Sequence, residues 1–95
     1  MIVELRDQEL YLQGKINAEN AEKVYQQGWI IVSEQTQPLV VNLSQLEQGS
    51  TLALAVLVRW LRQTPQAQGL VFKAVPNKML NIIQACHLEH DLKFI

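Results

Sequence analysis

The hydrophobic and polar positions of the chain predict short strands separated by helices. Residues 2–6 and 9–16 each alternate with a period of two, and a two-residue polar turn separates them. Two alternating segments so close together predict an antiparallel hairpin. Further strands are predicted at residues 39–43 and 69–74, and a short edge strand is predicted at residues 91–95.

Between these strands, apolar residues recur at the spacing of an amphipathic helix. The first helix is expected to begin after Asn17, whose side chain suits a helix N-cap, and to end near Glu34. Gly28 lies within it, where glycine costs about 1 kcal/mol relative to alanine unless close packing offsets that cost. Two more helices are predicted at residues 51–63 and 76–86. The predicted buried stripe of the first helix consists of Ala21, Val24, Tyr25, Gly28 and Val32.

The predicted order of elements is β-β-α-β-α-β-α-β, which indicates an α/β fold. Alternation of strands and helices after the hairpin implies right-handed parallel crossovers onto a mixed sheet. Residues 39–43 are apolar without interruption before Asn42, a pattern typical of a strand that is covered on both faces. With 95 residues, the chain is expected to form one domain, residues 1–95, with a small core.

The composition argues against several classes of function. The net charge is −1 and no basic cluster is present, so nothing favours binding to the phosphates of nucleic acid. No apolar run approaches the ~20 residues that span a bilayer, and the N-terminus lacks the pattern of a signal peptide. The single cysteine, Cys86, cannot form an internal disulfide and fits a reducing compartment. We therefore expect a cytoplasmic protein without a cofactor.

The familiar motifs of catalysis are missing. The sequence contains no G-x-G-x-x-G, no G-x-x-x-x-G-K-S/T and no G-x-S-x-G pattern. A nucleophilic hydroxyl also needs a base held close to it. The hydroxyls of Ser44, Ser50 and Thr51 are far in sequence from both histidines, His87 and His90. The sequence therefore predicts a protein that is not an enzyme.

One segment near the C-terminus contains residues that bind metals. Cys86, His87 and His90 form a C-H-x-x-H pattern, and zinc accepts all three side chains as ligands. A closed structural site needs four ligands, usually in two separated pairs, and the sequence has no second cluster of this kind. The simpler interpretation is that Cys86 packs at the end of a helix, with the histidines near the C-terminus of that helix. Metal binding is the alternative, which elemental analysis would detect.

The helix at residues 51–63 is apolar on two sides. Its sheet-facing stripe consists of Leu54, Leu57, Val58 and Leu61. The opposite side combines further apolar side chains with an arginine and a tryptophan, where a monomeric protein normally carries polar residues. Exposed apolar patches mark interaction sites, so a partner protein is expected to cover this side of the helix. The alternative is that another element of the same domain covers it. The residues predicted to bind a partner are Thr51, Leu52, Ala55, Val56, Arg59 and Trp60.

Two hydroxyls open this helix. Either Ser50 or Thr51 can cap it by accepting a hydrogen bond from a free backbone N–H, which contributes ~1 kcal/mol. Thr51 is also a candidate phosphoacceptor, because a helix N-terminus tolerates added negative charge whereas an apolar partner does not. A hydrogen bond between Thr51 and the partner is a third role, and capping is compatible with either of the others.

The helix entry GKINAENAEKV at residues 14–24 and the strand VVNLSQL at residues 40–46 resemble segments of the STAS domain family. The family forms are G-x-I/L-D/N for the entry and a hydrophobic strand ending in D-L-S. The resemblance covers nearly the whole chain, and it implies a mixed sheet with an N-terminal hairpin and helices packed on it. The family includes anti-sigma factor antagonists, cytoplasmic tails of anion transporters and a subunit of the bacterial Mla phospholipid-transport ABC system.

The family's D-S/T-S/T-G segment falls on residues 50–53 of this sequence. Thr51 matches the phosphoacceptor hydroxyl of the anti-sigma factor antagonists. However, Ser50 replaces Asp, Leu52 replaces a small residue and Ala53 replaces Gly, while Asn42 replaces the Asp of D-L-S. These departures predict that a kinase reading the acidic residue and its small neighbours would miss this site.

Within the family, the chain looks most like the Mla subunit. That resemblance implies a non-enzymatic regulatory subunit, cytoplasmic and peripheral to the inner membrane, that binds the ATPase of a membrane complex containing a permease. Binding would support assembly or activity of the ATPase and maintain outer-membrane lipid asymmetry. The alternative is an anti-sigma factor antagonist that is switched by phosphorylation of Thr51.

Overall fold

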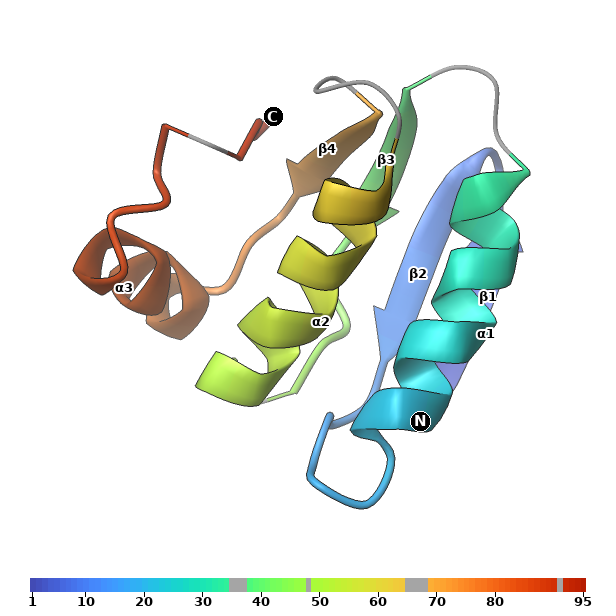
Figure 1. Cartoon of the computed structure of the whole chain (residues 1–95), viewed down its shortest axis with the longest axis horizontal. Helices are drawn as coiled ribbons and strands as arrows, with labels where there is room; N and C mark the ends of the chain where they lie inside the picture. Colours follow the sequence, from blue (N-terminus) through green and yellow to red (C-terminus); the bar gives the residue numbers. More distant parts are fainter. Residues whose placement is uncertain (35–37, 48, 65–68, 91) are drawn as a thin grey trace.

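The computed structural model describes residues 1–34, 38–47, 49–64, 69–90 and 92–95. Its elements follow the order β-β-α-β-α-β-α (Figure 1). They are β1 (Ile2–Arg6), β2 (Glu9–Gln13), α1 (Ala21–Ser33), β3 (Leu39–Asn42), α2 (Thr51–Gln63), β4 (Leu70–Lys73) and α3 (Asn77–Ala85). Each predicted helix and the first four predicted strands are present, so the predicted α/β fold class is confirmed.

The strands form one mixed sheet in the order β1-β2-β3-β4. The β1–β2 hairpin is antiparallel, whereas β2 pairs with β3 and β3 with β4 in parallel. In the hairpin turn, Asp7 and Gln8 have φ angles of 49° and 67°. Positive φ at both positions is typical of a type I′ turn, whose twist matches that of the two strands. The predicted hairpin and mixed sheet are thus confirmed.

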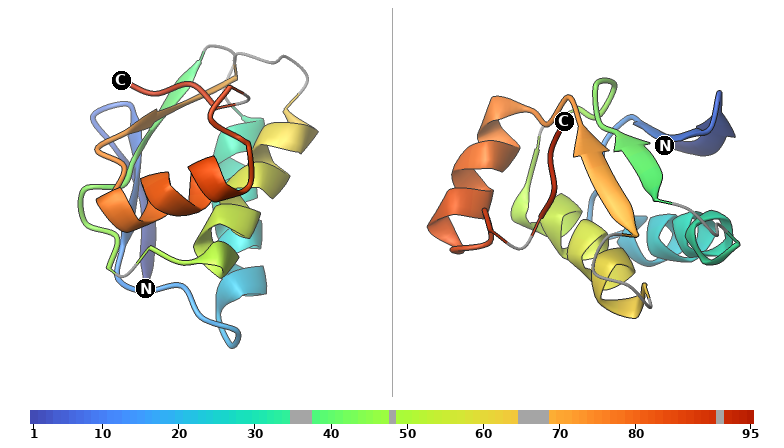
Figure 2. Two further views of the ribbon diagram at one scale, coloured as in Figure 1. Left: turned by 90° about the vertical axis from the view of Figure 1, so that its left-hand side faces the viewer. Right: turned by 90° about the horizontal axis from the view of Figure 1, so that it is seen from above.

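One face of the sheet packs on the helices. Leu10 and Leu12 of β2, Val41 of β3 and Phe72 of β4 alternate toward this face, and each is at most 1% exposed. Helices α1 and α2 cover them side by side, and α3 packs beside α2 (Figures 1 and 2). The core therefore lies between the sheet and the α1–α2 layer.

The opposite face of the sheet is more polar. We call it the open face, and it carries Ile2, Glu4, Arg6, Glu9, Tyr11, Gln13, Val40, Asn42, Val71 and Lys73. Most of these side chains are half-buried or exposed, and Val40 in the middle of β3 is half-buried. The predicted position of this strand inside the sheet is confirmed, because β3 lies between β2 and β4, but the prediction that both faces of the sheet are covered is wrong. The reason is that the neighbouring strands place charged residues beside Val40 and Asn42.

The predicted edge strand at residues 91–95 is reduced to a single bridge. Phe94 pairs with Phe72 in parallel, the N–H of Phe72 donates to the carbonyl of Lys93, and the N–H of Ile95 donates to the carbonyl of Phe72. Leu92 is buried, which anchors the segment to the core. Asp91 lies outside the described residues. The last β of the predicted order is therefore not a strand in the described structure.

The start of α1 differs slightly from the prediction. The side-chain oxygen of Asn17 accepts hydrogen bonds from the backbone N–H groups of Glu19 and Asn20 at 2.9 and 3.0 Å. Asn17 thus has the expected capping role, but it caps a turn that precedes α1. The helix itself begins at Ala21, after Asn20.

Close packing between α1 and α2 occurs at Gly28. A Cβ atom on Gly28 would lie 2.0 Å from Cζ2 of Trp60, so the indole ring occupies the space that a side chain would need. The indole Nε1 of Trp60 donates a hydrogen bond of 2.9 Å to the carbonyl oxygen of Tyr25. The packing that offsets the helical cost of glycine is therefore present. The predicted stripe is confirmed, with Val24, Tyr25, Gly28 and Val32 buried and Ala21 half-buried.

Candidate functional site

The loop before α2 ends at a capping serine. Ser50 has an extended backbone, and its Oγ accepts a hydrogen bond of 3.1 Å from the backbone N–H of Ala53. Ser50 therefore satisfies one of the free donors of the first helical turn. Thr51 is the first helical residue and is exposed, and its hydroxyl has no hydrogen-bond partner within the described part of the chain. Of the two hydroxyls that the sequence left as alternatives, Ser50 caps the helix.

Two of the residues predicted to face a partner are instead part of the core. Val56 is 2% exposed and Trp60 is 0% exposed, so neither side chain can contact a second protein. The physical reason is that α1 packs on the second apolar side of α2, where Gly28 allows the indole ring to approach. The prediction that Val56 and Trp60 are exposed is wrong, and the alternative of cover by the same domain holds for them.

The other predicted residues lie on the exposed side of α2. Leu52 is 36% exposed, and a second arginine on this side, Arg62, was missed by the sequence analysis. Its position three residues after Arg59 was the available signal, because residues three apart share a helix face. We call this surface the outer face of α2, and it consists of Thr51, Leu52, Ala55, Arg59 and Arg62. It combines apolar and basic side chains, and α2 contains no acidic residue.

Arg59 is held in place by α1. Its Nη1 lies 2.7 Å from Oε2 of Glu22, and its guanidinium lies over the ring of Tyr25, 3.6 Å from the ring centre. The hydrogen bond with Arg59 lowers the pKa of Glu22, and the same bond raises the pKa of Arg59. Tyr25 is itself buried, and its hydroxyl donates a hydrogen bond to Oε1 of Gln63. Two helices therefore fix the orientation of one exposed arginine.

A separate polar network surrounds Asn42 on the open face. Asn42 is 5% exposed; its Nδ2 donates to Oε1 of Glu9 at 3.0 Å, and its Oδ1 accepts from the backbone N–H of Ser44. The ammonium of Lys73 lies 3.2 Å from Oε2 of Glu9. The hydrogen bond from Asn42, followed by the contact with Lys73, lowers the pKa of Glu9. An aspartate at position 42, as in the D-L-S pattern, would instead face a second carboxylate.

The substitution Asn42→Asp is therefore expected to destabilise the fold at pH 7 by about 1–3 kcal/mol, because it removes a buried donor and adds a like charge. The deficit should shrink below about pH 4, where a protonated aspartic acid regains a donor. In the unchanged protein, the lowered pKa of Glu9 means that its stabilising contribution is present above its unfolded pKa. This contribution is lost as the pH falls through the folded pKa.

Urea unfolding followed by circular dichroism measures both effects at pH 7, where ordinary carboxyls are ionised, and at pH 3.5, which lies below the ordinary pKa values of aspartate and glutamate, about 3.9 and 4.3. Gln13→Glu is the matched control, because it also adds a carboxylate on an exposed position of β2. Equal losses for both variants at pH 7 would contradict the local explanation.

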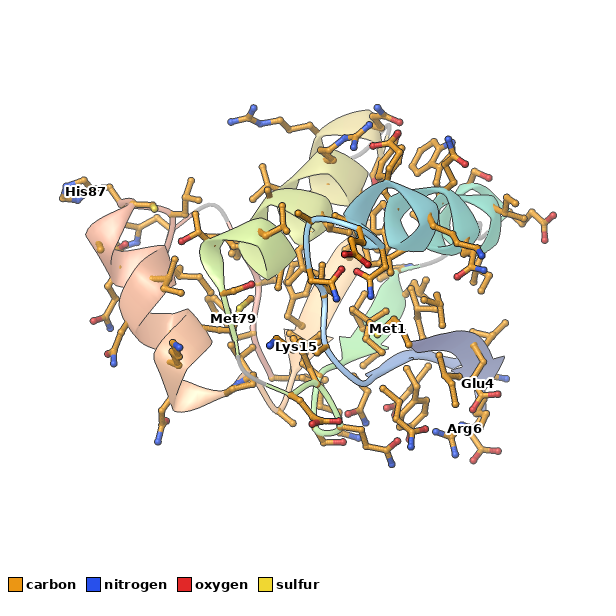
Figure 3. The ribbon with its side chains drawn as sticks, turned by 90° about the horizontal axis from the view of Figure 1, so that it is seen from below. Met1, Glu4, Arg6, Lys15, Met79 and His87 are labelled. Carbon is orange, nitrogen blue, oxygen red and sulfur yellow. The ribbon has the colours of Figure 1, made fainter. Side chains whose placement is uncertain are left out.

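At the far edge of the open face, Arg6 forms an exposed cluster. Its Nε lies 2.9 Å from Oε1 of Glu4, and its guanidinium lies over the ring of Tyr11. Figure 3 shows Glu4 and Arg6 together at this end of the molecule, far from His87 at the opposite end. The charges in this cluster are paired, so they provide no net attraction for a charged ligand.

The C-terminal end of α3 does not gather a set of metal ligands. Cys86 follows the last residue of α3, as predicted, but its side chain is exposed and is not packed. His87 has a φ angle of 57° and points away from the molecule (Figure 3). In the part of the chain that the structure describes, no three His, Cys, Asp or Glu residues are placed to hold a metal ion. None of the described helices has the length and hydrophobicity needed to cross a bilayer.

Comparisons with known proteins point to one family. The family model described as "Mlab, STAS domain" matches residues 3–94. A chain of the Acinetobacter MlaFEDB complex in the ATP-bound Vtrans2 conformation is 60% identical, with a TM-score of 0.93 and coverage of 100% of both chains. In the ATP-bound Vtrans1 conformation, the matching chain is 61% identical over 99% of this chain and 100% of that chain, with a TM-score of 0.91.

A more distant likeness extends to another group of proteins. An anti-sigma factor antagonist from Mycobacterium paratuberculosis has a TM-score of 0.80 over 98% of this chain and 81% of that chain, but only 20% identity. At this identity the likeness shows the fold alone. None of the curated proteins matches this chain.

Proposed function

Because the chain belongs to the STAS domain family, matching the Mlab model over residues 3–94, we propose that it is the STAS subunit of an Mla-type phospholipid-transport ABC complex. The observation that carries this proposal is the 60% identity, over the full length of both chains, to a chain of the MlaFEDB complex. The resemblance to the STAS family that the sequence indicated is confirmed by the family model.

In this role the chain binds an MlaF-like ATPase subunit, within a membrane complex that also contains a permease. It catalyses no reaction of its own, and it supports the assembly or activity of the ATPase. It is cytoplasmic and is held at the inner membrane through its partner. By supporting lipid transport, it contributes to the lipid asymmetry of the outer membrane.

The outer face of α2 is the proposed contact with the ATPase. Its apolar members, Leu52 and Ala55, are exposed next to the guanidinium of Arg59, which α1 holds in place, and next to the Thr51 hydroxyl, which has no hydrogen-bond partner among the described residues. A surface of this kind offers both apolar area and directional hydrogen bonds, which together characterise protein interfaces. Val56 and Trp60 are buried, so they hold α2 in place by packing and are not part of the contact surface.

Co-purification tests the proposed function. The ATPase of the same organism, carrying an affinity tag, is co-expressed with this chain and with the permease. We expect the chain to elute with the ATPase in size-exclusion chromatography and to remain bound after extended washing. Recovery of the chain only as a free protein, with the ATPase correctly folded, would contradict the proposal.

The alternative of an anti-sigma factor antagonist has less support. The distant structural likeness reflects the fold, and the segment around Thr51 lacks the aspartate and glycine of the family pattern. Phosphorylation of Thr51 nevertheless stays a prediction that mass spectrometry of the protein from native cells can test. Phosphothreonine at Thr51, together with binding to a kinase of the anti-sigma type, would favour this alternative.

A further inference from the structure

We infer that Glu22 is a positioning residue for partner binding, which holds Arg59 of the outer face of α2 in the orientation that the ATPase contacts. This inference rests on the proposed function and extends the functional surface from α2 to α1. It assigns a role to an acidic residue that the sequence analysis did not select.

Two residues of α1, Glu22 and Tyr25, confine the guanidinium of Arg59. Glu22 holds the guanidinium from one side through the 2.7 Å contact, and the ring of Tyr25 supports it from below at 3.6 Å. Tyr25 is 8% exposed and bonded to Gln63, so its ring cannot easily move with the arginine. The guanidinium is thus confined by two contacts from α1, although nearly half of the arginine side chain, 45%, remains exposed.

An arginine that is already confined loses less conformational entropy when a partner binds. Arginine is among the residues that lose most rotamer freedom when they are fixed, and a binding surface that fixes them in advance avoids that loss on association. A guanidinium has five N–H donors in a planar fork, so the bond to Glu22 leaves other donors for acceptors on a partner. An arginine that is ordered yet still exposed is therefore suited to recognise an oxygen acceptor.

The outer face of α2 is basic, and this determines the charge of the surface that it can bind. Arg59 and Arg62 lie on one helix face, and α2 contributes no acidic residue to balance them. Glu22 pairs with Arg59, which leaves Arg62 without an ion-pair partner among the described residues. The complementary surface on the ATPase therefore presents at least one carboxylate, placed against the two arginines beside an apolar area that meets Leu52.

The test is a double-mutant cycle of binding affinity. The variant Glu22→Ala is expected to bind the purified ATPase about three- to tenfold more weakly, the range expected when one long side chain must be ordered on binding. In an Arg59→Ala background, the same change should cause no further loss. Glu19→Ala is the matched control, because Glu19 is also exposed and acidic and lies just before α1; its affinity should equal that of the unchanged protein.

A readout in the free protein separates positioning from general stability. The side-chain resonances of Arg59 should be shifted by the ring current of Tyr25 in the unchanged protein, and should move toward ordinary arginine values in Glu22→Ala. Circular dichroism should show the same fold in all variants. A purely structural role would change the melting temperature of Glu22→Ala but not its affinity for the ATPase.

Two results would overturn the inference while the proposed function stands. One is unchanged affinity of Glu22→Ala; the other is tighter binding, which would mean that Glu22 competes with the partner for Arg59. If instead the unchanged protein does not bind the ATPase, the proposed function fails. The inference then fails with it.

Discussion

Replacing Leu52 with aspartate is expected to weaken binding to the ATPase by roughly 30- to 700-fold, the factor that corresponds to a hot-spot loss of about 2–4 kcal/mol. The reason is that a carboxylate at this exposed position would be buried in the interface without a partner. The fold should be retained, because Leu52 lies in the first turn of α2, where negative charge is favourable.

Thr51→Glu should have a comparable effect on binding for the same reason. Thr51 is the first residue of α2, so a glutamate there also suits the helix N-terminus while it places a charge in the contact. Thr51→Val tests the hydroxyl alone, because it keeps the shape of the side chain and removes its hydrogen-bonding capacity. Isothermal titration calorimetry with the purified ATPase measures all three affinities.

The matched control for these variants is Ile30→Asp. Ile30 is 61% exposed on α1, so the substitution changes an exposed apolar residue to the same acid away from the outer face of α2. It should bind the ATPase with unchanged affinity. If Leu52→Asp and Ile30→Asp bind equally well, the outer face of α2 is not the contact.

Replacing Trp60 with alanine is expected to destabilise the protein by about 3–5 kcal/mol, the usual cost of removing a large aromatic side chain from a core. Trp60 is 0% exposed, fills the space beside Gly28 and bonds to the carbonyl of Tyr25. Since a small domain has a total stability of about 5–15 kcal/mol, this loss leaves little margin. Urea unfolding followed by circular dichroism measures it.

A second substitution tests whether the tight contact between α1 and α2 is the cause. Gly28→Ala alone should destabilise the protein by about 1–3 kcal/mol, because the new methyl group would overlap the indole ring. In the Trp60→Ala background, the same change should be neutral or stabilising, because the ring is gone and alanine favours a helix. An equal loss in both backgrounds would contradict this explanation of the glycine.

Local patterns in the sequence predict most of the fold. The two-residue turn between alternating segments specifies the hairpin, and the apolar period specifies the helices within a few residues. The cap at Ser50 is also readable, because short hydroxyl side chains before an apolar run suit that position. The segment at residues 91–95 was not readable in this way, because its one bridge to Phe72 depends on tertiary packing.

The error at Val56 and Trp60 has a simple origin. A helical period shows which residues share a side of α2, but it does not show which neighbouring element covers that side. Gly28 was the available signal, because a costly glycine within a helix indicates that another element approaches closely there. The link between Glu22 and Arg59 has no comparable signal, since it joins residues 37 positions apart.

The open face offers the competing surface for a partner. Hydrogen exchange of the chain, measured by mass spectrometry with and without the ATPase, distinguishes it from the outer face of α2. The first-turn amides of Thr51 and Leu52 lack acceptors within the helix, whereas Ser50 accepts from the N–H groups of Ala53 and Leu54, so Thr51 and Leu52 should report on cover by a partner. We expect exchange to slow in the peptides that contain residues 51–59 and to stay unchanged in β2. Slower exchange in β2, with none at residues 51–59, would contradict the proposal that α2 forms the contact.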